Sequence, residues 1–238
     1  MHYTLEVCLL ALTLTPSTVP LLVAQSEART HPPLQKGISV ELPVTSNAVP
    51  LPDADQENAL IVTVTDEGSV YVGIGLTTTA ALAERVKGGL SNRTEKKVYI
   101  KADARTPYAS VARVLEALRT AGVEAPNLLT AQTGSSEPGT LVSPKGLEVS
   151  LGPRLASGSE AVVLQVAKSG QRLPRLKVND EPVPWEALQS TLRLLFQNRR
   201  DRVVLLKAEG TLPFADVVKA ADMCRSTGTE VVLVTPPQ

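Results

Sequence analysis

The feature that most constrains the fold of this chain is a pattern that occurs twice, at an offset of 106 residues. Residues 98–103 read VYIKAD and residues 204–209 read VLLKAE, and both are short apolar runs typical of a buried strand. A short polar turn, a proline and an aromatic residue follow each run. Proline fits the start of a helix because its φ angle is already helical and its missing N–H would have no intrahelical partner there. The repeat therefore predicts a strand–turn–helix unit in each half of the chain.

The helix after each proline is expected to bury one face. In the first helix, apolar residues have the i, i+3, i+4, i+7 spacing of an amphipathic helix, at Val111, Val114, Leu115 and Leu118. Their counterparts in the second helix are Val217, Ala220, Ala221 and Cys224. Thr106 is predicted to cap the first helix, and Thr211 the second, because Leu212 has no side-chain oxygen.

The elements around this unit also occur in both halves. Each half starts with an alternating segment, at residues 37–43 and 146–153, which is expected to form a strand. A valine-rich hairpin follows at 59–72 and 161–178, and then a first helix at 78–90 and 184–196. The last strands are predicted at residues 127–130 and 231–235. The predicted fold class is α+β, with two tandem copies of a small two-layer β-β-β-α-β-α-β domain after an N-terminal apolar helix.

Composition places the boundaries between these parts. Residues 25–36 and 132–145 contain several prolines, serines, threonines or glycines, which is typical of extended or flexible linkers. The first domain is therefore expected to cover residues 37–131, and the second residues 146–238.

The overall composition argues against nucleic-acid binding and against catalysis. Acidic and basic residues balance at 24 each and aromatic residues are only 3%, so neither a basic footprint nor a stacking platform for bases is expected. The two histidines, His2 and His31, both precede the predicted domains. A Ser–His pair or a metal cluster cannot be assembled from them in a folded region. We expect a protein that is not an enzyme and uses no cofactor or metal.

The N-terminus is open to two interpretations. Residues 7–24 contain no charged side chain. A run of this length is about the shortest that can span a membrane as a helix. A cleaved signal peptide is the alternative, because small residues suited to cleavage occur near Glu27 and Arg29. Both interpretations export the rest of the chain.

Each half resembles the periplasmic domain of the ExbD/TolR biopolymer-transport family. The shared features are the GISVELP segment at 37–43, the valine-rich hairpin, VYIKAD at 98–103, Pro107 followed by Tyr108, and Ala121 followed by Gly122. The second half is degenerate, with Glu209 in place of aspartate and Phe214 in place of tyrosine. The resemblance implies a small α+β domain that acts as a dimer. The two copies are therefore expected to pair within one chain or between two chains.

The resemblance extends to the N-terminus, where the family's transmembrane helix begins with Asp-Val-Leu-Leu and has a proline fourteen residues after the aspartate. Here Glu6 precedes Val7, and Pro20 lies fourteen residues after Glu6. The resemblance thus implies a transmembrane anchor at residues 1–24, with Glu6 as the proton-responsive carboxylate.

The resemblance also implies a function and partners. The chain would be a single-pass inner-membrane accessory subunit of a proton-motive-force-driven complex, with both domains in the periplasm, supporting biopolymer or nutrient transport across the outer membrane. Its implied partners are a multi-helix proton-channel subunit and a periplasm-spanning energy-transducing protein. The alternative function is an exported interaction or binding module, soluble after signal cleavage, with no proton-channel role.

Four residues inside the domains are candidates for contacting a partner or ligand: Asp103 and Tyr108, with their counterparts Glu209 and Phe214. Each has a simpler structural interpretation. Asp103 sits where a carboxylate can accept backbone N–H groups of a turn, and Glu209 would do so less well. Tyr108 and Phe214 are placed to pack at the start of a helix.

Overall fold

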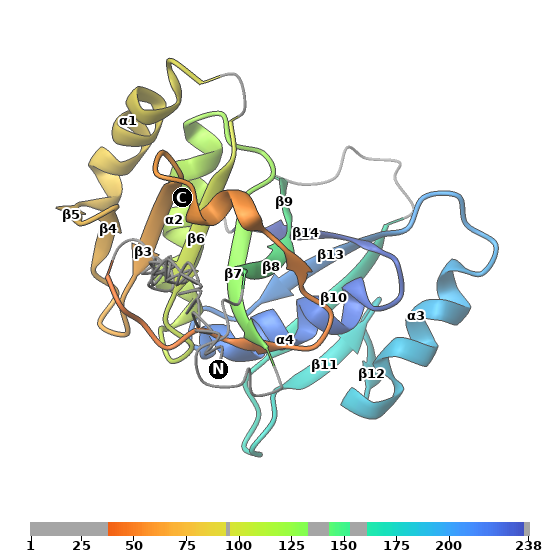
Figure 1. Cartoon of the computed structure of the whole chain (residues 1–238). Coiled ribbons are helices and arrows are strands. Elements are labelled where there is room, and N and C mark those ends of the chain that lie inside the picture. The colour runs from red at the N-terminus through yellow and green to blue at the C-terminus, as the bar shows by residue number, and fades with distance from the viewer. Residues whose placement is uncertain (1–37, 94–95, 133–142, 153–160, 236–238) are drawn as a thin grey trace, which may run out of the picture. The chain divides into compact units, whose positions relative to one another are not determined.

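The computed structural model describes residues 38–93, 96–132, 143–152 and 161–235. All of them belong to one compact unit that covers residues 32–238 (Figure 1). The N-terminal segment expected as an anchor or signal peptide, residues 1–24, and the linker at 25–36 lie outside the described residues. Among the described residues, no helix has both the length and the apolar character needed to cross a membrane.

The first repeat forms a mixed sheet with helices on one face. Its strand order is β2-β8-β7-β6-β3-β4-β5, and β1 pairs with β7 outside this order. The elements are β1 (Val44–Thr45), β2 (Val49–Pro50), the 3-10 helix η1 (Pro52–Asp55), β3 (Leu60–Val64), β4 (Val70–Val72), β5 (Gly75–Thr77), α1 (Thr79–Leu90), β6 (Val98–Ala102), α2 (Tyr108–Thr120), β7 (Asn127–Gln132) and β8 (Lys145–Glu148).

The second repeat forms a sheet with strand order β12-β11-β10-β13-β14-β9. The elements are β9 (Ser150–Gly152), β10 (Val162–Ala167), β11 (Arg175–Val178), β12 (Glu181–Val183), the 3-10 helix η2 (Trp185–Ala187), α3 (Leu188–Phe196), β13 (Val203–Ala208), α4 (Phe214–Arg225) and β14 (Glu230–Val234). Five strands correspond one to one, because β5-β4-β3-β6-β7 and β12-β11-β10-β13-β14 have the same order. This agrees with the duplication that the sequence predicts.

The apolar stripes of the helices are buried, as predicted. Every position of the stripe in α2 and of its counterpart in α4 is at most 1% exposed. Apolar residues of both repeats form one continuous core. Burying a leucine or valine contributes about 1.5–3 kcal/mol relative to leaving it exposed, so this shared core is a major source of stability.

The two sheets differ in how their second face is covered. Every residue of β3 and β6 is buried, because η1 and the chain around it pack on the face opposite the helices. This second cluster contains Ala54, Ile61, Tyr99 and Leu129. In β10 buried and half-buried residues alternate, which is typical of a sheet packed on one side. The repeat is therefore symmetric in topology but not in burial.

Some predicted element boundaries were wrong. Residues 38–43 are not a strand, and the second leading segment is divided into β8 and β9 at Val149. Strand β8 pairs antiparallel with β7 of the first sheet, whereas β9 pairs parallel with β14 of the second. The short strands β5 and β12 were not predicted, and the helix expected at 184–196 begins as the 3-10 turn η2.

The predicted threonine caps were also wrong. The hydroxyl of Thr106 donates to the carbonyl oxygen of Thr65 in the β3–β4 turn. That of Thr211 donates to the Glu209 carboxylate at 2.8 Å. Neither α2 nor α4 has a side-chain cap, and both helices start one residue after the proline. The first N–H groups of each helix instead donate to carbonyl oxygens of the other repeat.

Candidate functional site

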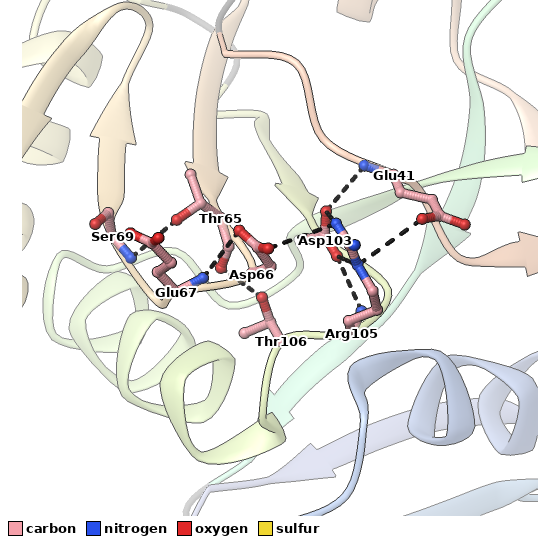
Figure 2. A network of polar contacts seen from close by, with 8 residues as sticks. All are labelled: Glu41, Thr65, Asp66, Glu67, Ser69, Asp103, Arg105 and Thr106. Carbon is pink, nitrogen blue, oxygen red and sulfur yellow. Dashed lines mark hydrogen bonds and ion pairs between the residues drawn. The ribbon is translucent and has the colours of Figure 1, made fainter.

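The turn after β6 holds a buried carboxylate, that of Asp103, which is 2% exposed (Figure 2). Its two oxygens accept the backbone N–H groups of Glu41 and Arg105, both at 3.0 Å. The N–H of Glu41 comes from the segment that precedes β1, whereas Arg105 belongs to the turn itself. Asp103 therefore ties the leading segment of the first repeat to the end of its central strand.

Arg105 completes the coordination of this carboxylate. Its Nε donates to one oxygen of Asp103 at 3.0 Å and its Nη2 to the other at 3.2 Å. These bonds are the main reason that the pKa of Asp103 is lowered from its ordinary value, although burial opposes the effect. The same contact raises the pKa of Arg105. Glu41 and Asp66 lie farther from the guanidinium, at 3.8 and 3.6 Å.

This cluster places Arg105, rather than Asp103, where a partner could reach it. The side chain of Arg105 is 64% exposed and that of Asp103 only 3%. Because the Asp103 oxygens already accept four hydrogen bonds, the geometry matches the structural interpretation of a turn carboxylate.

Glu209, the counterpart of Asp103, has a different environment. It is exposed, and its carboxylate accepts the backbone N–H of Lys168 and the hydroxyl of Thr211, both at 2.8 Å. The bond from the Lys168 N–H is the main cause of the lowered pKa of Glu209. The additional methylene of glutamate thus reaches the loop after β10, and Thr211 stands where the first repeat has Arg105.

The first backbone N–H groups of α2 and of α4 each donate hydrogen bonds to carbonyl oxygens of the other repeat. The backbone N–H groups of Tyr108 and Ala109 donate to the carbonyl oxygens of Leu212 and Gly210, at 2.8 and 2.9 Å. At the equivalent positions of the second repeat, Phe214 and Ala215 return these bonds to the carbonyl oxygens of Thr106 and Ala104, again at 2.8 and 2.9 Å. The first N–H groups of a helix have no intrahelical acceptor. Each repeat therefore provides the cap that the other lacks, in the manner of a two-fold symmetric interface.

The rings of Tyr108 and Phe214 lie inside the shared core, each only 1% exposed. The Tyr108 hydroxyl is buried without a hydrogen-bond partner among the described residues. Burial raises the pKa of this hydroxyl. The two rings are placed to pack at the start of the helices, and neither forms part of the exposed surface.

A second pair of contacts crosses between the repeats through equivalent carboxylates. Asp222 of α4, which is 6% exposed, accepts the backbone N–H groups of Ser46 and Asn47 at 3.0 and 2.9 Å. It also accepts the side-chain amide of Asn47 at 3.1 Å. At the same position of α2, Glu116 accepts the hydroxyl of Thr235, beyond β14, at 2.7 Å. Arg119 also bonds Glu116 and is the main cause of its lowered pKa.

Sequence analysis missed Asp222, Glu116 and Arg105. A signal for the first two was present, because both are acidic and lie 106 residues apart on equivalent amphipathic helices. Their role depends on the contact between the two repeats, which local sequence patterns do not specify. Arg105 has no basic counterpart, and nothing in its local sequence marked it.

Glu6, the candidate proton-responsive residue, lies outside the described residues. In the part of the chain that is described, no group of three or more His, Cys, Asp and Glu side chains is arranged to hold a metal ion. Cys224 is buried in the stripe of α4, and burial raises the pKa of its thiol to about 12. At that pKa the thiol stays protonated at neutral pH, which fits a packing role.

Comparison with known proteins identifies the family. The profile described as Biopolymer transport protein ExbD/TolR matches residues 21–133 and 139–238. The two matched segments correspond to the two repeats, and the first begins after Glu6. No curated protein and no solved structure matches the chain. Because the two segments together span most of the sequence, the chain belongs to the ExbD/TolR family of biopolymer transport proteins.

Proposed function

We propose that this chain is a membrane-anchored accessory subunit of a proton-motive-force-driven complex that supports biopolymer or nutrient transport across the outer membrane. In this proposal residues 1–24 anchor the chain in the inner membrane and both domains lie in the periplasm. A multi-helix proton-channel subunit and a periplasm-spanning energy-transducing protein are its partners. The role is one of assembly and energy transfer, not of catalysis.

The observation that carries this proposal is that both family matches fall on domains that are joined reciprocally within one chain. Four reciprocal backbone hydrogen bonds at the helix starts, the side-chain contacts of Asp222 and Glu116, and one apolar core are among the contacts that connect the repeats. A single chain would thus supply the paired domains that the family resemblance implies. The covalent connection makes pairing independent of protein concentration, because the second domain is always present at a high effective concentration.

The proposed role of Glu6 follows from its expected location. A carboxyl group in a membrane span is costly to ionise, so its default interpretation is functional. Burial raises the pKa of a carboxyl group toward neutrality. Such a group can take up and release a proton as its access alternates between the two sides of the membrane.

A second candidate function is an exported interaction module with no role in a proton channel. The observation in its favour is that the family match starts at residue 21 and does not include Glu6. In this alternative, the N-terminal segment is cleaved as a signal peptide and the paired domains act as a soluble protein in the periplasm or outside the cell.

Cell fractionation with N-terminal sequencing separates the two functions. The anchored subunit is expected in the inner-membrane fraction with its N-terminus intact, and it should co-purify with a multi-helix membrane protein after mild detergent extraction. Recovery of a soluble protein that begins near Glu27 or Arg29 would contradict the anchored role and support the exported module.

A further inference from the structure

The first repeat carries a surface groove of about 650 Å³ between the β4–β5 edge of the sheet and the beginning of α1. Figure 1 shows α1, β4 and β5 close together. The walls of the groove include Val70 and Leu76 from the two strands and three consecutive threonines at 77–79. They also include two arginines, Arg85 and Arg113. No carboxylate is among its lining residues.

The two arginines bring positive charge that is not neutralised locally. Arg85 donates from Nη1 to the carbonyl oxygens of Gly75 and Leu76, at 3.3 and 3.0 Å. Arg113 donates from Nη2 to the hydroxyl of Ser110 at 3.3 Å. Neither guanidinium forms an ion pair within the described chain, unlike Arg105 and Arg119. Each also retains N–H groups that these bonds do not use, since a guanidinium has five donors.

One exposed apolar side chain, that of Leu76, lines the groove, and a second, that of Ile74, lies two residues before it in the chain. Ile74, at the β4–β5 turn, is 82% exposed, and Leu76 of β5 is 64% exposed. Few other large hydrophobic side chains are as exposed in the described part of the chain. Strand β5 is also the outer strand of its sheet, and β4 is its only partner among the described strands. The surface therefore combines two cations with an aliphatic rim on an exposed edge.

The second repeat has a groove at the corresponding place. Seven lining positions of the first groove are residues 68–70 and 76–79. At the offset of 106 they become residues 174–176 and 182–185, all of which line the second groove. The duplication therefore produced two equivalent grooves whose chemistry has diverged.

The cation at the equivalent of Arg113 is already engaged in the second repeat. This residue is Lys219, whose Nζ lies 4.9 Å from the centroid of the Trp185 ring, within the range of a cation–π interaction. Trp185 takes the place of Thr79, and Thr191 takes that of Arg85. Exposed Leu76 is replaced by Pro182, a residue common on protected edge strands. Only the first groove presents two arginines without carboxylate partners.

We propose that the groove of the first repeat, between β5 and the start of α1, binds an acidic, extended peptide segment of a partner protein. Its carboxylates would bond the free N–H groups of Arg85 and Arg113, and its aliphatic side chains would cover Ile74 and Leu76. A small anion alone would leave both aliphatic side chains uncovered. This inference goes beyond the proposed function, because it requires neither the membrane anchor nor Glu6.

The test is a binding titration of the purified full-length chain with a fluorescent peptide of alternating glutamate and leucine. The matched control peptide alternates glutamine and leucine. We expect the acidic peptide to bind at least about tenfold more tightly, and the double variant Arg85→Gln/Arg113→Gln to lose at least about tenfold in affinity, since charge-assisted bonds are the stronger class. Lys87→Gln and Lys219→Gln, on α1 and at the equivalent position of the second repeat, should leave binding unchanged.

A groove-filling variant provides a test that keeps both charges. Thr79→Trp introduces the side chain that the second repeat has at this position, where it can stack on Arg113, and should also weaken peptide binding. Thermal melting of each variant establishes that it is folded. Binding that is unaffected by both variants, or equal for the two peptides, would overturn the proposal. So would arginine-dependent binding to vesicles of phosphatidylglycerol and phosphatidylcholine without peptide binding, because it would assign the groove to an anionic membrane surface.

Discussion

The backbone N–H of Tyr108 at the start of α2 donates to the carbonyl oxygen of Leu212, 2.8 Å away in the other repeat. The equivalent residue of α4 returns the bond at the same distance. Because these are main-chain bonds, they depend little on side-chain identity. This explains how the pairing tolerates a second repeat in which Thr106 has become Leu212 and Tyr108 has become Phe214.

Replacing the buried carboxylate of Asp222 is expected to destabilise the pairing of the repeats. Asp222→Ala removes the charged acceptor of the N–H groups of Ser46 and Asn47, and a hydrogen bond to a charged group contributes about 1.5–3 kcal/mol. The urea midpoint should fall accordingly. Glu84→Ala, on the exposed face of α1, is the control and should change stability by no more than about 0.5 kcal/mol. Equal effects of the two variants would show that Asp222 does not hold the turn.

The two aromatic residues at the helix starts allow a reciprocal exchange. Tyr108→Phe removes a buried hydroxyl without a partner, so the free energy of unfolding should stay constant or rise by up to about 1 kcal/mol. Phe214→Tyr, at the equivalent buried position, adds such a hydroxyl and should lower the free energy of unfolding by about 1–3 kcal/mol. Urea titrations of both variants measure the difference. A clear loss of stability in Tyr108→Phe would mean that the hydroxyl has a partner in solution.

Asp103 should make the first repeat sensitive to acid. The pKa of this carboxyl in the folded chain lies below its ordinary value of 3.8, so its stabilising contribution is complete above that value. The contribution is lost as the pH falls through the folded-state pKa, because the unfolded chain binds the proton first.

Urea midpoints measured from pH 2.5 to pH 6 for the wild type and for Asp103→Asn test this expectation. The variant should be less stable at pH 6, and the difference between the two proteins should shrink as the pH falls. Glu116 and Glu209 also have lowered pKa values but are present in both proteins, so the difference isolates Asp103. A difference that is constant with pH would contradict the assignment.

The lysines at equivalent positions of β6 and β13 differ in burial, which gives a matched comparison. Lys101 is 3% exposed and burial lowers its pKa, whereas Lys207 is exposed. Folding therefore disfavours the charged form of Lys101 at neutral pH. Lys101→Met should raise the free energy of unfolding by about 0.5–2 kcal/mol, while Lys207→Met should have little effect. Because Lys101 is protonated in the unfolded chain, the gain should diminish as the pH approaches 10.5.

The proton-responsive role proposed for Glu6 is tested in the native host. Glu6→Gln keeps the size of the side chain but removes its ability to ionise, so transport driven by the complex should fall strongly. The amount of the protein in the membrane must be measured in the same cells. Undiminished transport at equal protein level would rule out proton carriage and leave the chain as a scaffold.

The amino-acid sequence alone determined the duplication, the fold class and the buried helix faces. These properties depend on local periodicity: the 3.6-residue stripe of α2 and the apolar runs of β3 and β6 are visible without knowledge of the tertiary structure. The family resemblance came from the same strand–turn–helix motifs, and the family match over both repeats agrees with it.

Only the tertiary structure decided how the repeats pair and which residues serve that pairing. The caps of α2 and α4 come from carbonyl groups of the other repeat, and main-chain acceptors leave no mark in the sequence. Strand β8 joins the first sheet although it lies in the second half, because strand pairing depends on the space available at an edge and not on chain order. The buried Lys101 and the exposed Lys207 stand in similar local sequences, so the difference in their burial comes from the tertiary structure, in which the second face of the first sheet carries its own apolar cluster.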